Sequence, residues 1–150
     1  MTIKEKRFHE FYMKKCIDLA LVAKERGDSP VGSLIVQKGK IIAEGIEGGK
    51  THNDITYHAE IEAIRDAIKF LHTNNLSDCI LYTTHEPCIM CSYVIRNHKI
   101  KNIIVGVTTG EIGGYSSQLP ILLDITITKW GEPPAIIDGI LKDECKNLNK

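Results

Sequence analysis

Two short motifs, His58-Ala59-Glu60 and Pro87-Cys88-Ile89-Met90-Cys91, constrain this chain more than any other feature. Together they offer one imidazole and two thiols as metal ligands, and one carboxylate that need not be a ligand. A structural zinc site closes with four protein ligands, whereas three ligands leave the fourth tetrahedral position open for water. The motifs therefore predict a catalytic site in which His58, Cys88 and Cys91 hold a single Zn²⁺.

The alternative to a catalytic site is a structural zinc site, or a group of reduced core thiols. A structural site would need a fourth protein ligand, which would have to be His52, His85 or an isolated cysteine. The chain has five cysteines, and its first residues are charged and lack the apolar stretch of a secretory signal. We therefore expect reduced thiols in a cytoplasmic protein, with Cys16 as a small core residue.

The composition is that of an ordinary globular protein. Its 150 residues are 43% apolar and 25% charged, which fits one domain over residues 1–150. No apolar run approaches the roughly 20 residues of a membrane-spanning helix, so no membrane association is expected. Lysine plus arginine equals aspartate plus glutamate, at 19 each, whereas proteins that bind phosphates usually have a basic surface. A nucleic-acid partner is therefore less expected than a small molecule, although a local basic patch would suffice.

Apolar periodicity predicts most of the secondary structure before the second motif. Residues 4–26 have the spacing of an amphipathic helix, which Gly27-Asp28-Ser29-Pro30 ends. Residues 33–36 and 40–44 are expected to form a hairpin. A polar loop then leads to a helix over 58–72.

The second half of the chain contains a further strand, helix and strand, at 79–84, 88–97 and 103–107. This order predicts a right-handed βαβ unit with parallel strands. The segment 108–123 is either a mobile loop over the pocket or a plain surface loop. Residues 124–130 alternate with period two and are expected to form a strand. Pro133-Pro134 should then begin a terminal helix with an apolar inner face, made by Ile137, Ile140, Leu141, Cys145 and Leu148.

Glu60 is a candidate functional residue even without its motif. It extends the inward apolar stripe of the 58–72 helix, and a buried carboxylate costs free energy unless something pairs with it. In a regular helix, residues two apart point in nearly opposite directions. His58 must therefore lie at the helix entry if both side chains are to reach one site.

The motifs, together with three neighbouring segments, resemble the cytidine deaminase-like family. Gly27 to Gly32 is similar to its G-x-x-P-V-G segment, and Asn53 to Glu60 is similar to N-D-P-T-A-H-A-E. Thr84 to Cys88 has the T-x-E-P-C form of the guanine deaminase and tRNA adenosine deaminase branches, and Lys99 to Gly106 resembles the following strand. The resemblance implies an α/β fold, a three-layer α-β-α sandwich with a mixed five-stranded sheet. It also implies a homodimer.

The resemblance implies a hydrolytic reaction as well. Zinc would lower the pKa of its water, and hydroxide would attack the amine-bearing carbon of a heterocycle. Glu60 would accept the water proton and later protonate the departing ammonia, acting as general base and then general acid.

Several residues are candidates for substrate contact. Glu47 stands where family members usually carry Asn, and a carboxylate only accepts hydrogen bonds, so the substrate would present donors. A loop glutamate in water is the alternative. Tyr57 could narrow the pocket, and Trp130 could close over a flat base, although packing accounts equally well for Tyr57 and better for Trp130. Glu86 and Pro87 adjoin the metal cysteines. The basic cluster Arg96 to Lys101 is interpreted as a solvated helix end rather than a phosphate site.

The sequence thus favours a zinc-dependent deaminase of a free nucleobase or nucleoside, of guanine or cytosine type. The alternative within the same chemistry is a tRNA-specific adenosine deaminase, against which the neutral charge, Glu47 and Tyr93 weigh. The alternative of another class is a non-catalytic zinc-binding interaction domain, for which Glu60 would be dispensable.

Overall fold

A mixed sheet of five strands forms the centre of the computed structural model, which describes residues 1–150. The order across the sheet is β2 (Lys40–Ile46), β1 (Gly32–Gln37), β3 (Cys79–His85), β4 (Asn102–Val107) and β5 (Ala135–Ile137). Strand β1 is antiparallel to both of its neighbours, whereas β3, β4 and β5 are parallel. The expected hairpin and the parallel β3-α4-β4 unit are therefore confirmed.

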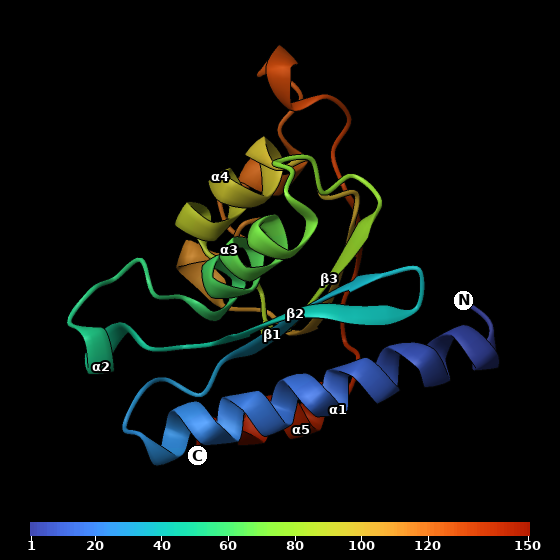
Figure 1. Ribbon diagram of the computed structural model, residues 1–150. Helices are drawn as coiled ribbons and strands as arrows, with labels where there is room; N and C mark the ends of the chain where they lie inside the picture. Colours follow the sequence, from blue (N-terminus) through green and yellow to red (C-terminus); the bar gives the residue numbers. More distant parts are fainter.

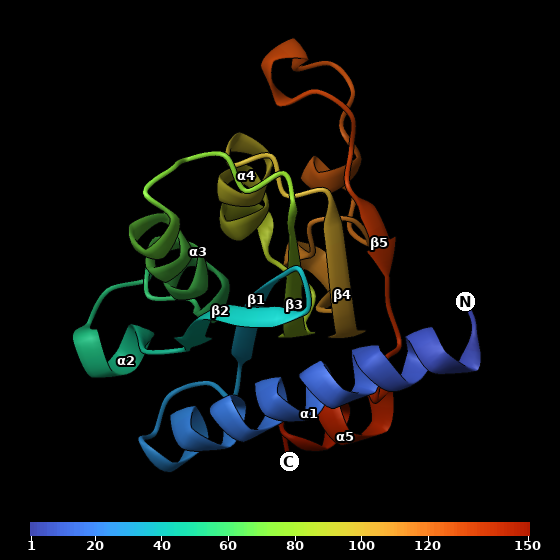
Figure 2. The same ribbon diagram turned by 45° about the vertical axis from the view of Figure 1, so that its right-hand side comes forward.

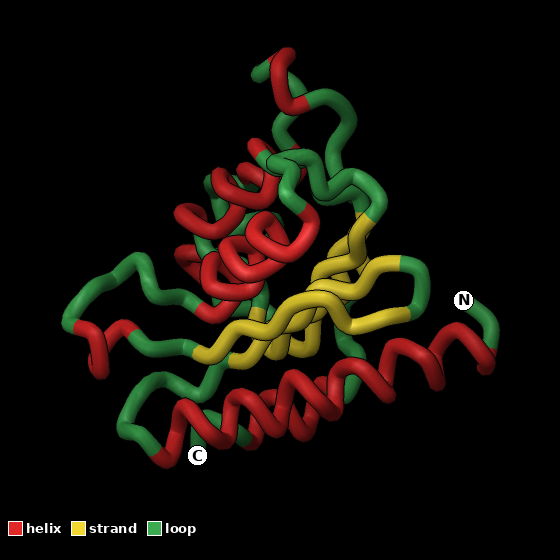
Figure 3. Tube along the Cα trace, viewed as in Figure 1, coloured by secondary structure: helices red, strands yellow, loops and turns green.

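Helices cover both faces of the sheet. Figure 1 shows α1 (Ile3–Glu25) and α5 (Lys142–Asn147) below it, and α3 (Ala59–Leu71) and α4 (Ile89–Asn97) above it. The tube in Figure 3 makes the three layers plain. The predicted α-β-α sandwich is thus confirmed. The polar loop before His58 contains one short helix, α2 (Gly49–His52), which the sequence did not predict.

The core lies on both sides of the sheet because successive strand residues point to opposite faces. Ile35, Leu81 and Ile103 pack toward α3 and α4, and their chain neighbours Leu34, Tyr82 and Ile104 pack toward α1. Full burial of such a side chain contributes about 1.5–3 kcal/mol. Cys16 is fully buried in the α1 cluster, as expected of a small core residue. No helix has the length and apolarity needed to cross a membrane.

A glycine brings the start of α3 directly against β2. A methyl group on Gly45 would collide with the backbone carbonyl of Ala59. Only a residue without a side chain permits this approach. The close contact places His58 and Glu60, at the start of α3, beside the sheet edge where β3 ends.

The strand expected over residues 124–130 is absent. Asp124 instead accepts hydrogen bonds from the backbone N–H and the hydroxyl of Thr126, which makes a tight turn, and η3 (Thr128–Trp130) follows. Ile125 is 78% exposed, so the period-two pattern has no buried face. Figure 2 shows this segment extending away from the sheet. Local side-chain bonds to the backbone have replaced strand pairing here.

The prediction of a terminal helix that begins at Pro133-Pro134 is also wrong. The residues that follow form β5, whose Ala135 and Ile136 pair with Asn102 and Ile103 of β4. The chain then turns through Gly139, with φ of 81°, and Leu141, with φ of 52°. These left-handed residues cannot continue a helix. A shorter helix, α5, begins only at Lys142.

Candidate metal centre and active site

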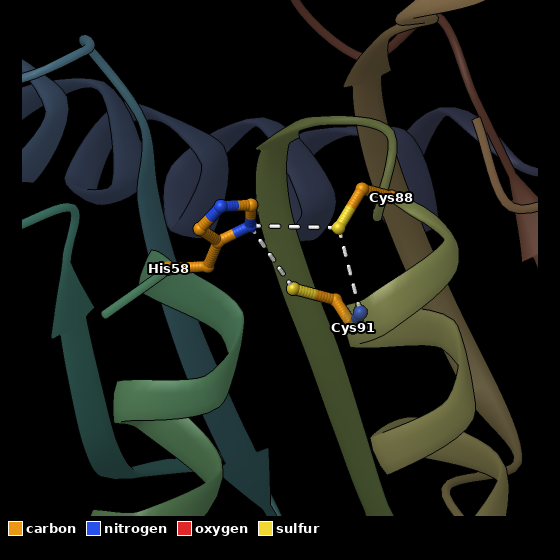
Figure 4. Close-up of side chains that lie close together, drawn as sticks. All are labelled: His58, Cys88 and Cys91. Carbon is orange, nitrogen blue, oxygen red and sulfur yellow. Dashed lines mark hydrogen bonds between the residues drawn. The ribbon is translucent and has the colours of Figure 1, made fainter. Parts of the chain in front are cut away.

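The three predicted ligands converge from the starts of two helices. His58 caps α3 with an extended backbone (φ −75°, ψ 148°), and Cys88 caps α4 in the same way (φ −72°, ψ 177°). His58 Nδ1 lies 3.5 Å from Cys88 Sγ and 3.4 Å from Cys91 Sγ (Figure 4). The expectation that His58 lies at the helix entry is confirmed.

The separations of these atoms match the demands of zinc. Bonds of about 2.3 Å to sulfur and about 2.0–2.1 Å to nitrogen, at a tetrahedral angle, place the two ligand atoms about 3.6 Å apart. No fourth histidine, cysteine, aspartate or glutamate joins the group. His85 is bonded to Thr84 and Asn149, and His52 stacks on Tyr57. The trio therefore fits an open zinc site and not a closed structural one.

Cys88 is the ligand of the trio that loses its proton most readily. Hydrogen bonds from Cys91 and then from His58 lower the pKa of the Cys88 thiol to about 4. The same Cys88 partner raises the pKa of His58 to about 9. It also raises the pKa of Cys91 well above the usual range for a thiol. Cys88 is thus a thiolate whose neighbours hold the protons that metal binding would release.

Glu60 lies next to the ligands but outside their group. Its side chain is 3% exposed, and Oε1 accepts a hydrogen bond from the Thr83 hydroxyl at 2.9 Å. Burial raises the pKa of Glu60 to about 7, although hydrogen bonds from Cys91 and Thr83 oppose the rise. A carboxyl group with a pKa near neutrality can both accept and release a proton at physiological pH.

A cavity of about 290 Å³ opens over this group. Zinc-site residues and the ends of several elements line it together, namely Ser29, Pro30, Val31, Glu47, His58, Glu60, His85, Glu86, Cys88, Thr109, Ile112 and Asn149. The carboxyl ends of β3 and β4 meet here, which is where ligands bind in sheets with parallel strands.

Glu47 is placed as a substrate contact would be. It lines the cavity, is 8% exposed, and accepts a hydrogen bond from the Gly49 N–H on Oε2 at 2.8 Å. The other oxygen, Oε1, has no hydrogen-bond partner in the protein and is accessible to solvent. An acceptor in the cavity is therefore still free. The alternative of a loop glutamate in open water is wrong.

Glu86 has a different role from the expected substrate contact. Its oxygens accept hydrogen bonds from the backbone N–H groups of Thr109, Tyr115 and Ser116, and from the Ser116 hydroxyl. Those hydrogen bonds outweigh burial and lower the pKa of Glu86. The carboxylate has no free face for a substrate, so it holds the loop instead. Glu86 lines the cavity but Pro87 does not, and the Pro87 carbonyl accepts a hydrogen bond from the Gly114 N–H.

The loop over residues 108–117 is bound closely to the metal-binding turn. A methyl group on Gly113 would collide with the Glu86 carboxylate, and one on Gly114 would collide with Ser92. Gly113 also forms a bridge with Cys88. Thr109 and Ile112 therefore form a wall of the cavity, and the segment is not a plain surface loop.

Tyr57 and Trp130 lie outside the cavity. The Tyr57 ring stacks on His52 with centroids 4.0 Å apart, beside an open groove of about 710 Å³. Trp130 is 2% exposed and packs against Arg96 and Tyr93. Neither aromatic ring closes over the zinc site.

Arg96 corrects the interpretation of the basic cluster. It is 2% exposed rather than solvated, and it donates hydrogen bonds to the carbonyl groups of Ile121 and Gly131. The guanidinium lies 4.9 Å from the Trp130 ring centroid. Arg96 thus holds the 121–131 segment against α4, which is a packing role.

Sequence reasoning missed three residues of the site. Thr83 donates a hydrogen bond to Glu60, and its position immediately before the T-x-E-P-C segment gave no chemical signal. His85 and Asn149 line the cavity, and their side chains lie 3.2 Å apart although 64 positions separate them in the chain. His85 stood inside a recognised motif, which was the one signal that could have found it.

Comparisons with known proteins cover most of the chain. A family model described as the cytidine and deoxycytidylate deaminase zinc-binding region matches residues 6–107. The tRNA-specific adenosine deaminase of Aquifex aeolicus is 38% identical over 124 residues, which are 81% of this chain and 82% of that relative. The guanine deaminase of Bacillus subtilis is 49% identical over 84 residues, which are 55% of this chain and 54% of that relative.

Solved structures show the same two kinds of neighbour. A structure from work on A-to-I editing by tRNA:A34 deaminases at the wobble position has a TM-score of 0.85 at 28% identity, and the match covers 92% of this chain and 98% of that one. The Bacillus subtilis guanine deaminase has a TM-score of 0.64 at 42% identity, over 67% of this chain and 64% of that one.

Proposed function

Since the chain belongs to the cytidine and deoxycytidylate deaminase family, as a zinc-dependent hydrolase of C–N bonds, we propose that it deaminates adenosine in tRNA. One observation carries this proposal, namely how far along the chain each likeness extends. Relatives named tRNA-specific adenosine deaminase match most of the chain, and the neighbouring tRNA:A34 deaminase structure spans nearly all of it. The sequence match to the Bacillus subtilis guanine deaminase covers 55% of the chain, and the match to its structure covers 67%.

The earlier preference for a free base of guanine or cytosine type loses part of its support. Tyr93 weighed against a tRNA substrate because it follows the metal cysteines. Its ring is 53% exposed, packs on Trp130 and does not line the cavity. Net charge is a weak argument, because phosphate contacts need only a local patch.

The mechanism that we propose uses Glu60 as the proton carrier. His58, Cys88 and Cys91 would hold the zinc ion, which would supply the activation of a water molecule. Glu60 is close enough to the ligands for Cys91 to hydrogen-bond to it, and burial raises its pKa to about 7. It can therefore take the proton of the attacking water and return it to the departing ammonia. The Thr83 hydroxyl orients the Glu60 carboxylate through Oε1.

A second candidate function, deamination of free guanine or a related purine base, is favoured by Glu47. Oε1 of this carboxylate has no hydrogen-bond partner in the protein and can accept a hydrogen bond from a ligand donor. A free purine base offers a ring N–H where a nucleoside carries its sugar. The ribose hydroxyl groups of a nucleoside are the competing donors.

The experiment that tests the proposal measures ammonia from zinc-loaded protein, with Glu60→Gln as the blank. The substrates are a tRNA anticodon stem-loop with adenosine at the wobble position, the same stem-loop with guanosine, and the free bases adenine, guanine and cytosine. Ammonia with inosine formed in the adenosine stem-loop supports the proposal. Release from guanine alone favours the second candidate.

A silent panel would overturn both candidates. With zinc present at one ion per chain, it would favour the non-catalytic zinc-binding domain. The measured zinc content therefore has to accompany every assay.

A further inference from the structure

His85 and Asn149 share the cavity with Glu60 and Cys88, yet the proposed mechanism uses neither. His85 is the last residue of β3, and Asn149 lies just beyond α5. Asn149 Nδ2 lies 3.2 Å from His85 Nε2. An uncharged, hydrogen-bonded pair therefore forms one side of the cavity that contains the metal centre.

The imidazole of His85 is held firmly. It is 8% exposed, and its Nδ1 lies 2.8 Å from Thr84 Oγ1, which also accepts a hydrogen bond from the Gly32 N–H. Because the Asn149 amide donates to Nε2, Nδ1 carries the ring proton and donates to Thr84. Burial lowers the pKa of His85, so the ring is neutral at pH 7. Its orientation and its hydrogen-bonding capacity are both set by the fold.

Contacts with α1 hold the backbone around Asn149. Leu148 is 4% exposed, and Lys24 Nζ donates to the carbonyl oxygens of Leu148 and Lys150, each at 3.0 Å. Lys24 belongs to the last turn of α1, and Figures 1 and 2 both show α5 alongside α1. The backbone on each side of Asn149 is thus fixed, while its side chain stays exposed at the cavity.

The Asn149 amide still has groups to offer. One Nδ2 hydrogen is used by His85, which leaves a second N–H and the oxygen Oδ1. A donor beside an acceptor complements the edge of a nucleobase, as in the pairing of asparagine with adenine. Neither residue carries a charge at pH 7, so the pair would not select a phosphate.

We propose that Asn149, positioned by His85, is a specificity-determining residue that hydrogen-bonds the edge of an uncharged nucleobase in the cavity. This inference rests on the proposed function, because it concerns the base to be deaminated. His85 acts through Asn149 and is a positioning residue.

The test measures binding separately from turnover. Zinc-loaded Glu60→Gln protein, which should not turn over, is titrated with the adenosine stem-loop, the guanosine stem-loop, adenine and guanine. Asn149→Ala should weaken binding of the adenosine stem-loop about 5-fold, as expected for one lost hydrogen bond. It should also reduce the ratio of the two stem-loop dissociation constants. Asn147→Ala is the matched control, since Asn147 is exposed on α5 and does not line the cavity.

Two further readouts separate specificity from a structural defect. In protein that retains Glu60, Asn149→Ala should raise KM about 5-fold and leave kcat within about 2-fold, because uniform binding is lost. His85→Phe keeps an aromatic ring at this position but removes the hydrogen bonds of the imidazole. It should weaken binding of the adenosine stem-loop to the same degree as Asn149→Ala. The double variant should be no weaker than either single variant, because the two residues act as one unit.

Several outcomes would overturn the inference. These are unchanged dissociation constants in Asn149→Ala, an equal loss in Asn147→Ala, additive losses in the double variant, or no binding of any probe. Failure of the proposed function looks different. If the protein with Glu60 releases no ammonia but the binding ratios change as expected, the deaminase proposal fails and the recognition pair stands.

Discussion

Glu60 and Glu86 are two buried carboxylates in the cavity that Cys88 lines, and they differ in the number of hydrogen bonds that they accept. Glu60 is 3% exposed and Glu86 is 2% exposed. Glu86 accepts hydrogen bonds from three backbone N–H groups and one hydroxyl, and its pKa is lowered. Burial dominates at Glu60 instead and raises its pKa to about 7. Burial alone therefore does not distinguish a chemical role from a structural one.

Two other buried acidic side chains, Glu47 in the cavity wall and Asp28 outside it, follow the same division. Asp28 is 5% exposed and accepts hydrogen bonds from Lys50 N–H, Thr51 N–H and the Thr51 hydroxyl. Glu47 is 8% exposed, and one of its oxygens accepts no hydrogen bond from the protein. In the number of hydrogen bonds accepted from the protein, Asp28 resembles Glu86, and Glu47 resembles Glu60. A buried carboxylate with spare acceptor capacity marks the functional side of the division.

The strongest test of the comparison is Glu60→Gln, which keeps the size of the side chain and removes its proton exchange. Turnover should fall by about 10²–10⁴-fold, the contribution of a general acid–base group. The zinc content should stay unchanged, because Glu60 is not in the ligand group. Ammonia release and metal analysis on the same sample measure both quantities.

Glu62→Gln is the matched control for Glu60→Gln. Glu62 lies two residues further along α3, and its side chain pairs with Arg65 at 2.8 Å on the outer face. Its turnover should stay within about 2-fold of the wild type, since an exposed pair contributes little. Loss of zinc from Glu60→Gln would instead make Glu60 a ligand.

Glu86→Ala should destabilise the fold rather than only slow the reaction. It leaves the N–H groups of Thr109, Tyr115 and Ser116 without their acceptor, and the free energy of unfolding should fall by about 3 kcal/mol. Urea unfolding measures the change. Glu111→Ala, at an exposed position on the same loop, should change stability by less than about 0.5 kcal/mol. A stable Glu86→Ala protein with slow turnover would return Glu86 to the list of substrate contacts.

The division between the carboxylates explains which parts of the site could be predicted from the sequence. His58, Glu60, Cys88 and Cys91 lie in local motifs, and the chemistry of zinc restricts which residues can bind it. The partners of Glu86 come from positions 23 to 30 residues away, in a loop without periodicity. Hydrogen bonds between distant loops follow no sequence pattern, so Glu86 was predicted as a substrate contact.

The fold also has parts that the sequence predicts and parts that it does not. Apart from α2, the helices and strands up to residue 107 were predicted because regular apolar spacing matches their packing. Residues 124–130 also alternate, yet the Asp124 turn and the Arg96–Trp130 contact determine their structure. The apolar residues after Pro134 suit a helix or a strand equally well, and pairing with β4 decides for the strand. Tertiary contacts overrode local preference in both segments.

Asp28→Asn tests the structural class of carboxylate through pH. Hydrogen bonds, first from the Thr51 hydroxyl, lower the pKa of Asp28 in the folded protein. Its contribution, about 1–2 kcal/mol, is therefore present above the unfolded pKa of about 3.9 and is lost as the pH falls through the folded value. The difference in unfolding free energy between wild type and variant should be constant from pH 5 to 8.

Below about pH 4 that difference should shrink, because unfolded wild-type protein takes up a proton at Asp28 that the folded protein takes up only at lower pH. Asp18→Asn, at an exposed position on α1, serves as the control and should show no such pH dependence. A difference that grows on acidification would contradict the direction of the Asp28 shift.

The smallest effect is expected for Glu47→Gln. This substitution tests whether a buried carboxylate with a spare acceptor, outside the proton-transfer step, contacts the substrate. The substitution exchanges one acceptor oxygen for a donor, so a substrate N–H or O–H loses its partner. KM should rise about 5-fold and kcat should change less than 2-fold, because the contact is made equally in the ground state and the transition state. Glu44→Gln, at an exposed position on β2, is the control and should change neither constant. An unchanged KM in Glu47→Gln would mean that a spare acceptor in this cavity does not mark a substrate contact, and Glu60 would then be the sole case on that side of the comparison.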